Sequence, residues 1–203
     1  FDGVDDCINV DTSVNDLSAT TKGTWSAWVK PQDGTPATSL MLVEFADTNA
    51  DAYLTSYIRA TNGKLETIGA IGGVIKWRLS TTAQAFNDNT WNHWAIVQDG
   101  TAPVLYVNGI AVAQGFTETA DKTLWFNAIA GLDNGRLSCN NRNSVGNANF
   151  VNGSLDEVTI FNRALSSGEI LALYNNSANR LQNNFTSLSD ATYNYSAYSI
   201  DKA

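Results

Sequence analysis

The stretch WNHWAIVQDGTAPVLYVNGIAVAQG, residues 91–115, decides the fold. It contains three short runs rich in β-branched and aromatic residues, which favour strands. Asp99-Gly100 and Asn108-Gly109 separate the runs, and such pairs supply the positive φ angles that tight hairpins require. We therefore predict a three-stranded antiparallel meander here.

Other segments show the same alternation of apolar and polar residues. They are bounded by Gly, Asn or Asp at intervals of about ten residues, which is typical of a sandwich of two antiparallel sheets. The segments are residues 24–31, 39–47, 52–60, 64–71 and 74–82, the last two joined by Gly72-Gly73. We expect an all-β fold.

A single short helix is predicted near the C-terminal end, in LSSGEILALYNN. Ser166 and Glu169 have the spacing of a capping box, in which each side chain bonds the other residue's backbone amide. Ile170, Leu173 and Tyr174 then recur at helical spacing and form one apolar face. This helix should pack against the sandwich.

We expect one domain over residues 1–175, followed by an extension over 176–203. The extension ends in SDATYNYSAYSIDKA and has no apolar core of its own. It is predicted to dock on the sandwich or on a neighbouring protein subunit. Because the chain starts at Phe1 without an initiator Met, we also expect a processed product or a piece of a longer protein.

Composition excludes two kinds of partner. The net charge is −8 with only twelve Lys and Arg, and nucleic-acid binding depends on clustered cations, so no nucleic-acid partner is expected. No apolar run reaches the roughly 18 residues that span a bilayer, so no membrane insertion is expected. Cys7 and Cys139 are too few for a disulfide framework, and we favour two buried free thiols over a single bridge.

Four blocks, taken in order, resemble the concanavalin A-like lectin/glucanase superfamily in its laminin-G-like jelly-roll branch. The blocks are FDGVDDCINV (1–10), TWSAWVKP (24–31), residues 91–115 and GSLDEVTIFNRALSSGEILALYN (153–175). Cys7, where the family usually has an aromatic residue, and Trp94, where a smaller apolar residue is usual, depart from the pattern. The resemblance implies a jelly-roll sandwich. Relatives of this kind are carbohydrate-binding modules, adhesion domains, sialidase side domains, phage decoration modules and, in the wider superfamily, glucanases.

The chain lacks the carboxylate pattern of those glucanases. Glycoside hydrolysis needs two carboxylates facing one cleft, and the superfamily's enzymes carry them on a Glu-x-Asp-x-(x)-Glu strand. No Glu-x-Asp occurs here. Asp156 and Glu157 would point to opposite faces of a regular strand, and His93, near Trp91 and Trp94, is expected to be a packed imidazole. We predict no catalytic residues, with a carbohydrate-active enzyme as the alternative.

The resemblance also implies a structural Ca²⁺ near the termini. Its natural ligands would be Asp2, the backbone carbonyl of Gly3 and Asp156. Regular alternation would place Asp156 on the inward-facing side, with Val158 and Ile160, at the rim of the sandwich. Hard oxygen ligands suit Ca²⁺. The alternative is that Asp2 makes an Asp-Gly turn and Asp156 accepts backbone amides.

Two segments are candidates for sugar binding. Alternation in residues 52–60 places Tyr53, Thr55, Tyr57 and Arg59 on one face, and aromatic faces with adjacent polar groups suit pyranose rings. The loop 140–153 is rich in asparagine, and Asn141 and Arg142 are its candidate ligands. By contrast, Trp28, Trp77 and Trp94 are predicted to be packing residues.

The sequence thus predicts a non-catalytic carbohydrate-binding or adhesion module at an extracellular or virion surface, with a glycan or a neighbouring protein subunit as partner. The first alternative is a purely structural phage or virus decoration domain without a sugar site.

Overall fold

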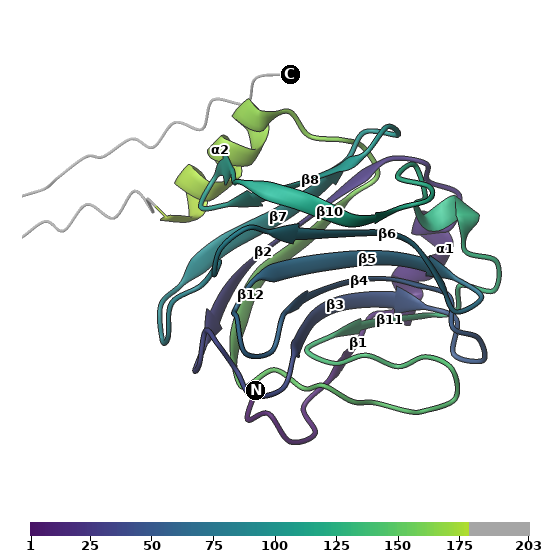
Figure 1. Ribbon diagram of the computed structural model, residues 1–203, viewed down its shortest axis with the longest axis horizontal. Helices are drawn as coiled ribbons and strands as arrows, with labels where there is room; N and C mark the ends of the chain where they lie inside the picture. Colours follow the sequence, from purple (N-terminus) through teal and green to yellow (C-terminus); the bar gives the residue numbers. More distant parts are fainter. Residues whose placement is uncertain (179–203) are drawn as a thin grey trace, which may run out of the picture.

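The computed structural model describes residues 1–178, which form two antiparallel sheets packed face to face (Figure 1). This architecture confirms the predicted two-sheet jelly-roll sandwich. One sheet has seven strands, in the spatial order β1 (Ile8–Asn9), β11 (Asn134–Leu137), β3 (Leu40–Ala46), β4 (Tyr53–Ile58), β5 (Leu65–Ile71), β6 (Val74–Thr81) and β10 (Gln114–Thr119). The other has five, in the order β12 (Gly153–Phe161), β2 (Gly23–Pro31), β7 (Asn92–Gln98), β8 (Pro103–Val107) and β9 (Ile110–Ala111).

The helix α2 (Ser167–Ala178) is the predicted C-terminal helix. Three single-turn helices also occur, at η1 (Asp11–Ser13), α1 (Val14–Leu17) and η2 (Phe126–Ala128). Such short turns carry no periodic pattern that a sequence could reveal. Among the described residues, no helix is long and apolar enough to cross a membrane.

The predicted meander is present as β7, β8 and β9. Asn108 and Gly109 have φ angles of 50° and 81°, which fit the tight turn expected between β8 and β9. The third strand is only two residues long, because the chain then crosses to the other sheet, where Gln114 pairs with Thr81 of β6.

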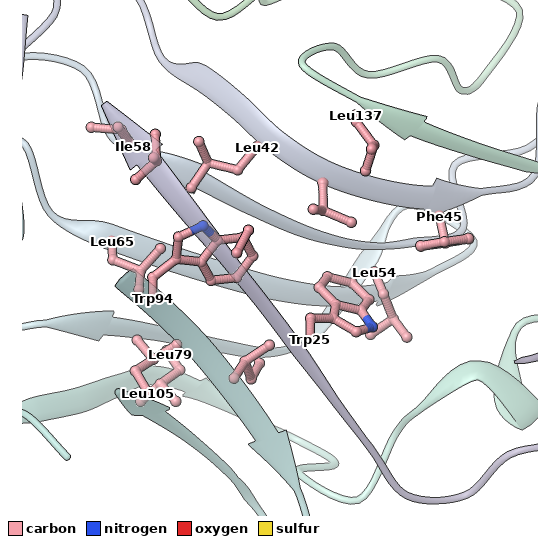
Figure 2. Close-up of a cluster of buried hydrophobic side chains, with 14 of the residues drawn as sticks. Trp25, Leu42, Phe45, Leu54, Ile58, Leu65, Leu79, Trp94, Leu105 and Leu137 are labelled. Carbon is pink, nitrogen blue, oxygen red and sulfur yellow. The ribbon is translucent and has the colours of Figure 1, made fainter. Parts of the chain in front are cut away.

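The core lies between the two sheets. Trp25 and Trp94 project from the five-stranded sheet toward apolar residues of the seven-stranded sheet (Figure 2). The labelled partners include Leu42, Phe45, Leu54, Leu65 and Leu79, all nearly inaccessible to solvent. Burying each such side chain contributes roughly 1.5–3 kcal/mol, so this layer dominates stability. Trp77 is also fully buried, which confirms the packing role predicted for it and for Trp94.

Helix α2 lies beside β8 and covers the outer face of the five-stranded sheet (Figure 1). Its Ile170 packs with Ala95, Val97 and Tyr106. Trp28, half-buried on the same face, stacks on Tyr174 with 5.6 Å between ring centroids, as its predicted packing role requires.

The predicted capping box forms at the start of α2. Glu169 N donates to Ser166 Oγ at 3.3 Å, and Ser166 N donates to Glu169 Oε2 at 2.8 Å. The predicted extension, 176–203, lies outside the described residues apart from 176–178, which continue α2.

Cys7 and Cys139 form a disulfide, so the favoured interpretation of two free thiols was wrong. The pairing of β1 with β11 explains the bond, because Ile8 lies opposite Leu137 and brings the two cysteines together. Their separation of 132 residues concealed this proximity in the sequence. The bond ties the N-terminal segment to the loop after β11.

β12 is not the regular strand that we predicted. Its register against β2 shifts between Asp156 and Thr159, so Glu157 and Val158 form a β-bulge, and Glu157 has a φ of 48°. Asp156 and Glu157 are both exposed, whereas Val158 and Ile160 pack on the core. Asp156 therefore does not point inward with Val158 and Ile160. The prediction that Asp156 and Glu157 point to opposite faces of the sheet assumed a regular strand, and the bulge removes that assumption.

Candidate functional site

The outer face of the seven-stranded sheet carries charged and aromatic residues. Tyr53, Thr55 and Tyr57 of β4 lie on this face, because Leu54 and Ile58 alternate with them and point into the core. We call the surface that carries Arg59, Arg78 and Arg142 the arginine face. It contains a hollow of about 370 Å³ lined by Thr38, Ser39, Met41, Thr55, Tyr57, Ile68, Arg142 and Asn149.

Glu66 of β5 is the first anchor of the arginine face. Its side chain has no exposed surface, and it accepts hydrogen bonds from Arg59 Nη1 and Arg78 Nη1, each at 2.8 Å. The Tyr57 hydroxyl also donates to it. Arg78 Nε reaches Glu118 of β10 at 3.1 Å. Two cations and a phenol thus satisfy one buried carboxylate, which fixes their positions on the sheet.

Glu44 of β3 is the second anchor, and it too is fully buried. Asn141 N donates to Glu44 Oε1 at 2.8 Å, and Arg142 Nη1 donates to Glu44 Oε2. The Arg142 guanidinium lies 3.7 Å above the ring of Tyr53, and its Nε is 3.5 Å from Asp51 Oδ1. Burial raises the pKa of Glu44 to about 7 although Arg142 opposes the shift.

The structure brings the two predicted sugar-binding segments together. Residues 52–60 and the loop 140–153 are far apart in the sequence, but Arg142 stacks on Tyr53 and lines the same hollow as Tyr57. Asn141 contributes its backbone amide through the bond to Glu44. All five predicted ligand-binding residues therefore belong to, or directly border, one surface.

Sequence reasoning missed Glu44, Glu66 and Arg78. Each is a charged residue within a strand whose neighbours are apolar or β-branched. A buried charge must find a partner of opposite charge. Single charged residues within neighbouring apolar strands were therefore the sequence signal that could have indicated these ion pairs. Assigning partners required the strand order β3, β4, β5, β6, which places Glu66 beside Arg78.

A family model described as the concanavalin A-like lectin/glucanases superfamily, of laminin-G type, matches residues 2–171. The chain belongs to this superfamily. The expected resemblance is confirmed over most of the domain.

Relatives of this laminin-G-type domain include sialidases. Sialidase B of Streptococcus pneumoniae serotype 4 is 40% identical over 67 residues, a match that covers 32% of this chain and 9% of that protein. The chain thus spans about a tenth of this curated relative.

Two solved structures share the fold of the domain. The CBM40 of the Ruminococcus gnavus IT-sialidase, bound to α2,3-sialyllactose, has a TM-score of 0.70 at 18% identity over 86% of this chain and 97% of that one. The NanB sialidase of Streptococcus pneumoniae has a TM-score of 0.69 at 22% identity over 85% of this chain and 27% of that one. At these identities the similarity establishes the fold alone.

His93 of the laminin-G-type domain lies on the other sheet, under α2. Its Nε2 is 2.7 Å from Ser26 Oγ, and its ring packs edge-on against Trp28. Burial lowers the pKa of His93 to about 4, and Glu157 opposes the shift. The imidazole is therefore neutral near pH 7, and its position fits the predicted packing role.

The predicted metal ligands lie near the N-terminus of the domain and on β12. Asp2 Oδ1 accepts a hydrogen bond from Val4 N at 2.9 Å, and Gly3 has a φ of 82°, as in the alternative Asp-Gly turn. Within the described part of the chain, Asp2, Asp5 and Asp6 have carboxylate oxygens within 4.8 Å of one another, and all three residues are exposed. Asp156 is not part of that group, and its Oδ1 accepts from Glu157 N at 2.8 Å. Calcium stays a prediction of the family resemblance.

Proposed function

We propose that this chain is a non-catalytic carbohydrate-binding module whose arginine face binds a glycan that ends in an acidic sugar. The proposal rests on the gathering of three arginines and two tyrosines on one sheet face, where Arg142 and Tyr57 line a hollow. Guanidinium groups bind carboxylates through paired, charge-assisted hydrogen bonds. Tyrosine rings offer apolar surface to a sugar ring at low entropic cost.

The protonation states of the arginine face favour binding over catalysis. Glu44 and Glu66 are both buried and bonded to arginines, so each is occupied in holding a cation. Burial and the adjacent Glu66 raise the pKa of Tyr57 far above its usual value. Its phenol therefore stays protonated and acts as a hydrogen-bond donor, which disfavours a role as a nucleophile.

Sialylated glycans are the ligand class that we infer. The Ruminococcus gnavus module of the same fold was solved with α2,3-sialyllactose, and the partial match to Sialidase B points to the same substrate class. The chemistry of this chain supports the inference independently, because sialic acid carries a carboxylate that Arg59, Arg78 and Arg142 can bind.

We further infer an extracellular location. The Cys7–Cys139 disulfide supports it, because disulfides persist in oxidising compartments. Association with a virion and a role in adhesion remain predictions from the sequence.

A glycan array tests the proposal. The domain should bind glycans ending in sialic acid and should not bind the same glycans after sialic acid removal. Arg142→Ala should weaken binding at least tenfold, which corresponds to about 1.4 kcal/mol. Arg163→Ala is the matched control, because Arg163 lies next to α2 and pairs with Glu169, away from the arginine face. Equal binding to the two glycan sets would contradict recognition of the acidic sugar, and binding to neither set would favour the structural decoration domain.

A further inference from the structure

One buried carboxylate bonds two neighbouring residues of the loop that carries Arg142. We call residues 140–149 the Arg142 loop. Both oxygens of Glu44 bind it, one through Asn141 N and the other through Arg142 Nη1. Two backbone bonds also join the loop to the rest of the sandwich: Ser144 N donates to Thr48 O at 2.7 Å, and Met41 N donates to Asn149 O at 3.0 Å. A bridge between Asn140 and Ala148 closes the loop on itself. Besides Glu44, the Arg142 guanidinium contacts Asp51, whose Oδ1 is 3.5 Å from Nε, and the ring of Tyr53.

The charges around Glu44 leave it weakly compensated. Arg142 is its cation, but Asp51 from the β3–β4 connection competes for the same guanidinium. Tyr53 of β4 is neutral. Arg136 is the register partner of Glu44 on β11, but its guanidinium bonds Asp11 and the carbonyl of Gly135. Glu66, by contrast, accepts from two arginines and a phenol. Glu44 is therefore the carboxylate of this face with fewer donors and only one bonded cation.

We propose that Glu44 is a positioning residue that holds Arg142 in the glycan site only while its carboxylate is ionised, so that glycan binding weakens when Glu44 gains a proton. The inference rests on the proposed function and adds a means of regulation. A proton on Oε2 removes the negative charge and the acceptor that face Arg142 Nη1. Arg142 then keeps Asp51 and the ring of Tyr53 as partners, without the charge of Glu44 to hold its Nη1.

The neutral range is where this change should occur, because burial raises the pKa of Glu44 to about 7. If only the ionised form binds, apparent affinity scales with the ionised fraction, which gives about tenfold weaker binding at pH 6 than at pH 8.

The folding stability contributed by Glu44 has the opposite pH dependence, because it is greater at pH 6 than at pH 8. Folding raises the pKa of Glu44, so the folded state holds the Glu44 proton more tightly than the unfolded chain does. The stability that this proton adds is complete below the unfolded pKa and is lost as pH rises through 7. Weaker binding at pH 6 would therefore not reflect unfolding through Glu44.

Calorimetric titration with 3′-sialyllactose between pH 6 and pH 8 tests the proposal. The wild type should bind about tenfold more weakly at pH 6 than at pH 8. Glu44→Gln, which mimics the protonated form, should bind at pH 8 at least as weakly as the wild type does at pH 6 and should show no pH step. Glu118→Gln is the matched control. It removes a partly exposed carboxylate from the same face without touching Arg142, so its pH step should persist. A flat wild-type profile, or a step that persists in Glu44→Gln, would overturn the proposal.

A measurement without ligand separates this inference from the proposed function. In ¹H–¹⁵N spectra, the Asn141 amide and the Arg142 Nε–H should titrate together near pH 7 in the wild type and stay unchanged in Glu44→Gln. If they titrate but no glycan binds at any pH, the proposed function fails and the positioning of Arg142 by Glu44 stands. If they do not titrate, Glu44 does not control the loop and the inference fails, whatever the glycan data show.

Discussion

At the residue scale, two glutamates explain how a strongly acidic protein can present cations to a ligand. Glu44 and Glu66 lie beneath the surface of one sheet face, and their arginine partners lie above them. The side chain of Arg59 is 46% exposed, whereas that of Glu66 is fully buried. The buried acids therefore fix the arginines in place, and the arginine side chains keep partial exposure, 46% for Arg59, 22% for Arg78 and 23% for Arg142.

Replacing Glu66 with Gln should weaken both the site and the fold. Arg59 and Arg78 would lose their shared counter-charge, so binding of 3′-sialyllactose should fall at least tenfold. The free energy of unfolding, measured with urea, should fall by about 2 kcal/mol, because charged donors lose a buried acceptor. Glu118→Gln, with a 40% exposed side chain, is the control and should cost well under 1 kcal/mol. Unchanged binding by Glu66→Gln would contradict the anchoring role.

His93 should destabilise the protein in acid. Its folded-state pKa of about 4 lies below the usual 6.5, so its contribution to stability is complete above pH 6.5 and is lost as pH falls through 4. Between pH 7 and pH 4.5 the expected loss is about 2 kcal/mol. Glu44 has the opposite effect on stability over this pH range. The test therefore compares the free energies of unfolding of the wild type and His93→Gln, measured by chemical denaturation at both pH values. A difference that does not change with pH would show that His93 does not carry this dependence.

At the element scale, the strands were predictable and their irregularities were not. Alternation placed β2 to β8 within a few residues, and Ser166 and Glu169 marked the start of α2. The bulge in β12 was missed because Asp156 and Glu157 fit a regular strand as well as a bulge, and no glycine marks the positive φ at Glu157. The two-residue strand β1 was too short for any periodic signal, so the proximity of Cys7 and Cys139 was hidden as well.

The disulfide between Cys7 and the start of the Arg142 loop should support both fold and binding. Cys139 lies three residues before Arg142, so its bond restricts the loop as well as closing a long chain segment. The double variant Cys7→Ser/Cys139→Ser should lose about 2 to 5 kcal/mol of unfolding free energy and bind 3′-sialyllactose more weakly. Reduction of the wild type with dithiothreitol is the parallel test. An unchanged dissociation constant in the folded variant would show that the loop is fixed without the disulfide.

At the scale of the whole molecule, the sequence predicted the sandwich and half of the candidate site. Tyr53, Tyr57 and Arg59 could be grouped because residues two apart share a strand face. Arg142 could not be joined to them from the sequence, because its contacts with Glu44 and Tyr53 connect segments that are far apart in the chain. Glu66 and Arg78 likewise depend on the spatial order of β5 and β6.

The calcium prediction is also a property of the whole fold. An ion that binds only the folded state must stabilise it. If Ca²⁺ binds through Asp2 and the backbone of Gly3, with Asp156 or with the nearby Asp5 and Asp6, a chelator should lower the Tm and added Ca²⁺ should restore it. Asp2→Asn should abolish the response. A Tm that does not change with chelator would contradict a structural calcium.

The central claim is that an acidic glycan binds on the arginine face. A crystal structure of the domain with 3′-sialyllactose tests it most directly. The sialic acid carboxylate should lie within hydrogen-bonding distance of Arg59, Arg78 or Arg142, with a tyrosine ring beside the sugar. A sugar bound on the five-stranded sheet, or an arginine face that stays empty at saturating ligand, would contradict the account.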